Sequence, residues 1–144
     1  MSLRTIALLL AAVPGLAYGH AVVTPAESSA GQAQQYTLHV PNEKDIPTLT
    51  VQLRFPAEID VTAVDEQDGW RLALKRDSSG RITGATWTGS LPPKAKVGFT
   101  FTARNAAAPA TVAWNVVQTY EGNVVVEWTG AAGSKTPASR TTIH

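Results

Sequence analysis

The chain contains no cysteine, and its single methionine is Met1. Disulfide bonds, thiolate metal sites, a cysteine nucleophile and a cysteine-linked lipid anchor are therefore excluded. The charges are nearly balanced, with 12 Lys and Arg against 11 Asp and Glu in 144 residues, so nucleic acid is not expected as a partner. The motifs of phosphate-binding loops, helical zinc proteases and serine-hydrolase elbows are also missing.

The N-terminus has the pattern of an export signal. Arg4 precedes an apolar run at residues 6–13, and Ala17-Tyr18-Gly19 supplies small residues before a cleavage site. This pattern predicts a signal peptide over residues 1–19, cleaved between Gly19 and His20. A membrane anchor is the alternative, but a spanning helix needs about 20 apolar residues. No later run is long enough to span, so we expect a periplasmic or secreted product without a membrane span.

The remaining sequence is typical of β-strands. Apolar and polar residues alternate with period two between Gln35 and Phe55, and weaker segments of the same kind follow at 59–64, 70–75, 81–88, 97–103, 111–120 and 124–129. These segments predict an all-β fold, an antiparallel two-sheet β-sandwich of immunoglobulin, fibronectin-III or cupredoxin-like topology. We expect one domain over residues 20–129 and a flexible C-terminal tail over residues 130–144.

Cleavage after Gly19 would leave His20 at the N-terminus of the product. A terminal histidine has a free α-amine and an imidazole Nδ1, which together close a six-membered chelate ring on one metal ion. Two nitrogens at right angles suit the tetragonal preference of Cu(II). The alternative is that His20 only marks the end of the signal and frays in solvent. Its position alone leaves both interpretations open.

The other two histidines are weaker candidates for metal ligands. His39 lies on the polar side of its strand, where it is either solvated or a second imidazole near the N-terminus. His144 is the last residue and is expected to fray.

Glu43 and two tryptophans complete the list of candidates. Glu43 follows Pro41-Asn42 directly after a strand, where a turn can direct its carboxylate towards the sheet end or leave it solvated. Trp70 and Trp128 alternate with aliphatic residues, which predicts core positions for both. Trp128 is closer to the end of its strand and is better placed to reach a metal at the rim of the core.

Five blocks of the sequence resemble the YcnI-like copper-binding domain family. They are GHAVVTP at 19–25, YTLHVPNEKDIPTLTVQLRFP at 36–56, DGW at 68–70, TWTGSLPPKAKVGFTF at 86–101 and QTYEGNVVVEW at 118–128. The resemblance implies a two-sheet sandwich that binds Cu(II) through a single-histidine brace. It implies His20 as the source of the amine and Nδ1, and Glu43 as the carboxylate. It further implies Trp128 as the aromatic wall, with Trp70 as the second choice.

The expected function is that of a non-enzymatic, extracytoplasmic Cu(II)-binding protein in copper trafficking, storage or detoxification. Another periplasmic copper carrier is a candidate partner. The lack of sulfur ligands favours Cu(II) over Cu(I). Three alternatives stay open: a copper monooxygenase with His39 as the second histidine of its brace, a CopC-like copper carrier, and a metal-free interaction sandwich.

Overall fold

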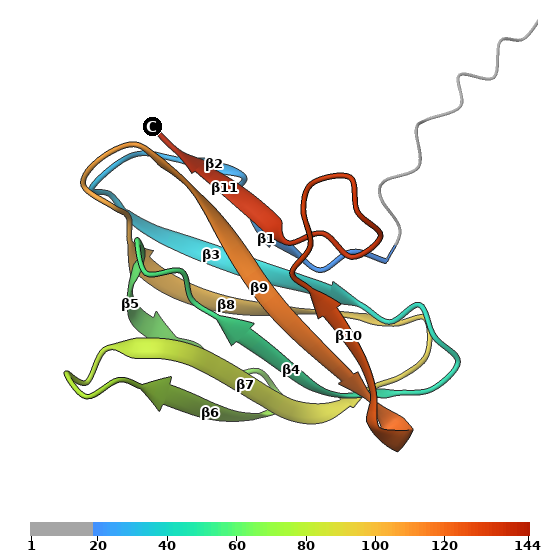
Figure 1. Cartoon of the computed structure of the whole chain (residues 1–144). Coiled ribbons are helices and arrows are strands. Elements are labelled where there is room, and N and C mark those ends of the chain that lie inside the picture. Colours follow the sequence, from blue (N-terminus) through green and yellow to red (C-terminus); the bar gives the residue numbers. More distant parts are fainter. Residues whose placement is uncertain (1–18) are drawn as a thin grey trace, which may run out of the picture.

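Two β-sheets pack face to face in the computed structural model, which describes residues 19–144 (Figure 1). The smaller sheet has the order β1–β3–β8–β5, and the larger has the order β2–β11–β9–β4–β7–β6, with β10 also paired to β9. The strands are β1 (Val22–Thr24), β2 (Glu27–Ser28), β3 (Ala33–Pro41), β4 (Thr48–Arg54), β5 (Asp60–Val64), β6 (Arg71–Arg76), β7 (Ile82–Leu91), β8 (Lys96–Arg104), β9 (Ala110–Tyr120), β10 (Val124–Trp128) and β11 (Ser139–Ile143). The predicted all-β, two-sheet sandwich is confirmed, although the pair β2–β11 is parallel.

Residues 1–18 of the predicted signal peptide lie outside the described residues. Within residues 19–144, no helix is both long and apolar enough to cross a membrane.

The core lies between the two sheets and is rich in aromatic rings. Alternate residues of β3 are buried, as period two requires: Tyr36 and Leu38 are fully buried, whereas His39 is exposed. Trp87 of β7 stacks on Phe99 of β8 with ring centroids 4.4 Å apart, which joins the two sheets. Burying one side chain of this size contributes about 1.5–3 kcal/mol, so the aromatic layer fixes how the sheets face each other.

The prediction of a flexible tail was wrong for residues 139–143, which form β11. This strand pairs antiparallel with β9 and parallel with β2, and its Thr141 and Ile143 are buried. Thr141 Oγ1 accepts a hydrogen bond from Trp114 Nε1 at 2.9 Å and donates one to the Pro25 carbonyl at 3.0 Å. The tail is small and polar in composition, but Thr and Ile on one face are good strand formers, and that alternation outweighs the composition.

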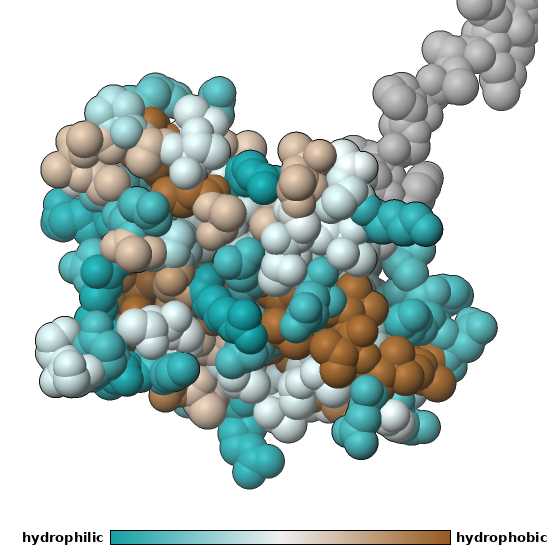
Figure 2. Space-filling view, viewed as in Figure 1, coloured by the Kyte–Doolittle hydropathy of each residue, from teal (hydrophilic) through white to brown (hydrophobic). Residues whose placement is uncertain are grey.

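Strand β9 has one edge that is shared by two partners. Its first half, residues 110–114, pairs with β11, and its second half, residues 116–120, pairs with β10. The turn η1 (Glu121–Asn123) reverses the chain before β10, and Gly122 adopts the positive φ of 76° that a side chain disfavours. β10 exposes Val124 and Val125, and Figure 2 shows an apolar patch where β10 lies in Figure 1. The reversal brings Trp128 beside the N-terminal segment.

Candidate metal centre

The segment around His20 is held in place by the first strand. Ala21 and Val23 are buried in the core, and β1 pairs with β3. The backbone N–H of Val23 also donates to Ser139 Oγ at 2.9 Å, which ties the first strand to the last. The residues that follow His20 are therefore part of the sandwich. Any frayed segment at the N-terminus would have to end at or before His20 itself.

The His20 imidazole lies against Trp128. The two ring centroids are 5.6 Å apart and the planes are tilted by 54°. Trp128 is nearly fully buried, and His20 is half-buried. Of the two tryptophans predicted as a wall, the structure thus places Trp128 next to His20. Trp70 instead meets Phe99 edge-on at 5.2 Å.

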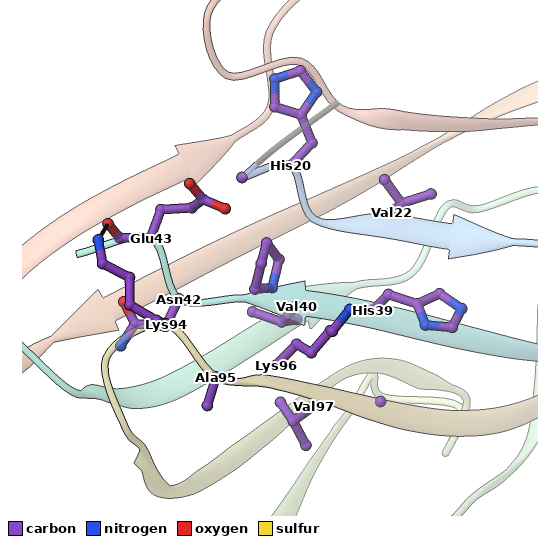
Figure 3. Close-up of a pocket in the computed structure, with 13 residues that line it drawn as sticks. His20, Val22, His39, Val40, Asn42, Glu43, Lys94, Ala95, Lys96 and Val97 are labelled. Atoms are coloured by element: carbon purple, nitrogen blue, oxygen red, sulfur yellow. Dashed lines mark hydrogen bonds between the residues drawn. The ribbon is translucent and has the colours of Figure 1, made fainter. Parts of the chain in front are cut away.

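The Glu43 side chain lies against the backbone at the Gly19–His20 junction. A Cβ atom built on Gly19 would lie 2.9 Å from Cγ of Glu43 and 3.7 Å from its Oε2. Figure 3 shows the Glu43 carboxylate directed towards this junction, while the His20 ring leaves on the other side. Glu43 is exposed, and within residues 19–144 its carboxylate takes part in no salt bridge. The carboxylate is thus available to interact with the backbone nitrogen of His20 or with an ion bound to that nitrogen.

Asn42 makes the turn that presents Glu43. Its side chain is buried, and its Nδ2 donates to the carbonyls of Ile46 at 2.9 Å and Leu91 at 3.0 Å. Its Oδ1 accepts from the backbone N–H of Lys44 at 2.9 Å. A satisfied buried amide of this kind fixes the turn. Sequence reasoning missed this role, although Asn42 lies in the block at residues 36–56 that resembles the YcnI-like family.

Gln118 supports the other side of the centre and was also missed. It is fully buried and accepts a hydrogen bond from Trp128 Nε1 at 3.0 Å. The signal in the sequence was a glutamine at an inward-facing position of a strand, between Val116 and Tyr120.

The charges near Glu43 are mixed. Lys94 Nζ donates to the backbone carbonyl of Glu43 at 2.6 Å and lies 3.7 Å from Oδ1 of Asp45. Lys44 Nζ lies 5.4 Å from the centre of the Tyr120 ring. Burial raises the pKa of the Tyr120 hydroxyl, and the negative charge of Glu43 raises it further. Tyr120 therefore stays neutral near pH 7 and adds no charge to the centre.

His39 does not join His20. It is exposed on the outer face of β3, and its Nε2 lies 2.9 Å from Thr24 Oγ1. In Figure 3 its ring points away from His20. The second-imidazole interpretation of His39 therefore finds no support in this geometry. The backbone of His144 bonds to Ser28 and Ala30, so this residue does not fray at the level of the main chain.

A surface hollow of about 1010 Å³ opens beside the centre. It is lined by Gly19, His20, Val22, His39, Val40, Pro41, Asn42, Glu43, Lys94, Ala95, Lys96, Val97 and Gly98. Within residues 19–144 no group of three or more His, Asp or Glu side chains is arranged to hold a metal ion. A metal at this place would take two side chains, those of His20 and Glu43, and would need backbone nitrogen as well.

Comparison with solved structures agrees with the fold. The chain is similar to an uncharacterized protein from Nocardia farcinica with an immunoglobulin-like fold, at 23% identity and a TM-score of 0.74, over 86% of this chain and 97% of the other. It is also similar to a non-cellulosomal cohesin from Archaeoglobus fulgidus, at 11% identity and a TM-score of 0.52, over 87% and 90% of the two chains. These likenesses concern the fold alone.

Comparison of sequences shows the family. The chain is 35% identical over 129 residues to the copper-binding protein CutI of Bacillus subtilis (strain 168), which covers 88% of this chain and 63% of the relative. The chain thus spans less than two thirds of that relative's length. The model of a domain of unknown function, DUF1775, matches residues 20–142. The chain therefore belongs to the DUF1775 family, in agreement with its resemblance to YcnI-like domains.

Proposed function

We propose that the chain is a non-enzymatic, extracytoplasmic Cu(II)-binding protein in copper trafficking, storage or detoxification. Its ligands would be the α-amine and imidazole of His20 and the carboxylate of Glu43, with Trp128 as a wall. One observation carries the proposal: the backbone at His20 lies against Glu43, while the imidazole of the same residue lies against Trp128. Copper binding itself is supported by the relative named a copper-binding protein.

The chemistry of these groups favours Cu(II). An N-terminal amine has an ordinary pKa of about 8, so a bound copper ion can displace its proton near neutral pH. The amine and imidazole nitrogens suit a tetragonal ion, and the carboxylate offsets part of its charge. The sequence offers no cysteine and no methionine other than Met1 as soft ligands for Cu(I). Reduction would therefore weaken binding, which suits transfer to another copper carrier.

The proposal requires cleavage of residues 1–19, because only cleavage converts the His20 nitrogen from an amide into an amine. The product would then be periplasmic or secreted. Gly19 is the residue packed against Glu43, so the new amine would form where the carboxylate already lies.

The test compares two proteins that differ only at the N-terminus. One begins at His20, and the other carries a short Gly-Ser linker before His20, which turns the amine into an amide. Each is titrated with Cu(II) and followed by electron paramagnetic resonance (EPR). We expect a tight one-to-one axial signal from the first protein that is lost or altered in the second. Equal, weak binding by both would refute the terminal amine as a ligand.

A second pair of variants tests the carboxylate. Glu43→Gln removes the proposed ligand charge, and Asp45→Asn removes a charge from the same turn without touching the junction. We expect Cu(II) affinity to fall in Glu43→Gln and to stay close to the parent value in Asp45→Asn. Equal losses in both would mean that the charge of the turn matters in general, and that Glu43 is not a ligand.

A further inference from the structure

Gln118 is a fully buried amide with a partner for every hydrogen bond that its side chain donates. Its Nε2 donates to Thr48 Oγ1 at 2.8 Å and to the Pro41 carbonyl at 3.0 Å. Its Oε1 accepts from Trp128 Nε1 at 3.0 Å. One side chain on β9 is thereby joined to the end of β3, the start of β4 and the end of β10.

These partners allow only one orientation of the amide. The Pro41 carbonyl is purely an acceptor and the Trp128 indole N–H is purely a donor. Rotating the amide by half a turn would set oxygen against oxygen at Pro41 and N–H against N–H at Trp128. The Trp128 N–H would then be buried without a partner, at a cost of about 1–3 kcal/mol, and the half-buried Pro41 carbonyl would face another oxygen. The network therefore holds the indole N–H on the inner side of the sheet.

This orientation decides what Trp128 offers to His20. The only polar atom of the indole donates its hydrogen bond to Gln118, so it is not available to His20 or to a group bound there. The same glutamine also bonds to Pro41, two residues before Glu43. Gln118 thus connects the aromatic wall to the turn that carries the carboxylate, although it does not line the hollow.

We propose that Gln118 is a positioning residue for the copper site. It holds the Trp128 ring against His20 and fixes the position of this ring relative to the turn that carries Glu43. This inference rests on the proposed function. Loss of the amide frees the indole to turn, so the surroundings of the copper ion change although no ligand has been removed.

The experiment uses Gln118→Leu in the protein that begins at His20. Thr141→Val is the matched control, because it removes the acceptor of another buried indole N–H, that of Trp114. Two signals are measured: the ¹H–¹⁵N resonances of the indoles without metal, and Cu(II) affinity with the EPR spectrum. For Gln118→Leu we expect a shifted Trp128 resonance, an altered EPR spectrum and about tenfold weaker binding, the size of loss that follows when a group that orients the surroundings of a bound metal is removed. For Thr141→Val we expect a shifted Trp114 resonance and parent-like copper binding.

Two further variants separate positioning from folding. Gln118→Asn keeps a buried amide but is too short to reach both Trp128 and Pro41, so it carries the test if Gln118→Leu does not fold. Gln118→Glu keeps an oxygen acceptor for Trp128 Nε1, so its Trp128 resonance and EPR spectrum should stay closer to those of the parent than the signals of Gln118→Leu do.

The outcomes distinguish this inference from the proposed function. If the parent binds Cu(II) and a folded Gln118→Leu or Gln118→Asn protein matches its affinity and spectrum, the positioning role is refuted and the proposed function stands. Losses as large in Thr141→Val would also refute it. If the parent itself binds no Cu(II), the proposed function fails, and the positioning role fails with it.

Discussion

The C-terminal strand gives the sharpest test of the fold. Thr141→Val keeps the shape of the side chain but removes its hydroxyl, which is fully buried between Trp114 Nε1 and the Pro25 carbonyl. Both groups would then lose their partner. Leaving a buried polar group unpaired costs about 1–3 kcal/mol, so we expect a loss of about 2–4 kcal/mol in the free energy of unfolding.

The assay is equilibrium unfolding in urea, with Thr142→Val as the control. Thr142 is the next residue of β11 but is exposed, so its replacement should change the free energy of unfolding by less than about 0.5 kcal/mol. In a domain of this size each kcal/mol shifts the melting temperature by about 3–5 °C, which a thermal scan would also register. Equal stability of the two variants would refute the view that residues 139–143 are part of the core.

Three further predictions concern pH, redox state and the wall. Burial raises the pKa of Tyr36 above its ordinary value of 10.0, so the contribution of Tyr36 to the free energy of unfolding should be constant up to about pH 10 and fall as the pH rises towards the folded pKa; a urea series at pH 8–11 tests this, and the free energy of unfolding of Tyr36→Phe should fall less. Reduction by ascorbate should release the bound copper to a Cu(I) chelator, because the proposed site has no sulfur ligand. Full retention of copper after reduction would contradict this prediction. Trp128→Phe should abolish most quenching of tryptophan fluorescence by Cu(II), whereas Trp70→Phe should leave it in place.

Much of the sandwich was predictable from the sequence, because buried and less buried residues alternate in half-buried strands such as β3, and in β4 from Val51 onwards. Strand β11 was not, because its buried positions are a threonine and one isoleucine within a polar segment. The parallel pairing of β11 with β2 joins segments from the two ends of the domain. Such a distant contact is not encoded in the local sequence pattern of either strand.

The residues of the candidate centre were also predictable only in part. His20, Glu43 and Trp128 were predicted from their chemistry and the family resemblance, and the structure brings them together. Asn42 and Gln118 were missed because a buried amide is recognised only by its partners, and those partners are distant in sequence.

The candidate centre is assembled from β1, the turn after β3, and strands β9 and β10, which meet only when both sheets have closed. Before closure, His20 and Glu43 are separate, weak ligands on a loose chain. Under the proposed function copper therefore binds the native protein and not the unfolded one, and free copper at 100 times the Kd would add about 2.7 kcal/mol to the free energy of unfolding. A protein that carries its cargo would then resist proteolysis better than an empty one, so that its lifetime outside the cytoplasm would follow the supply of the metal.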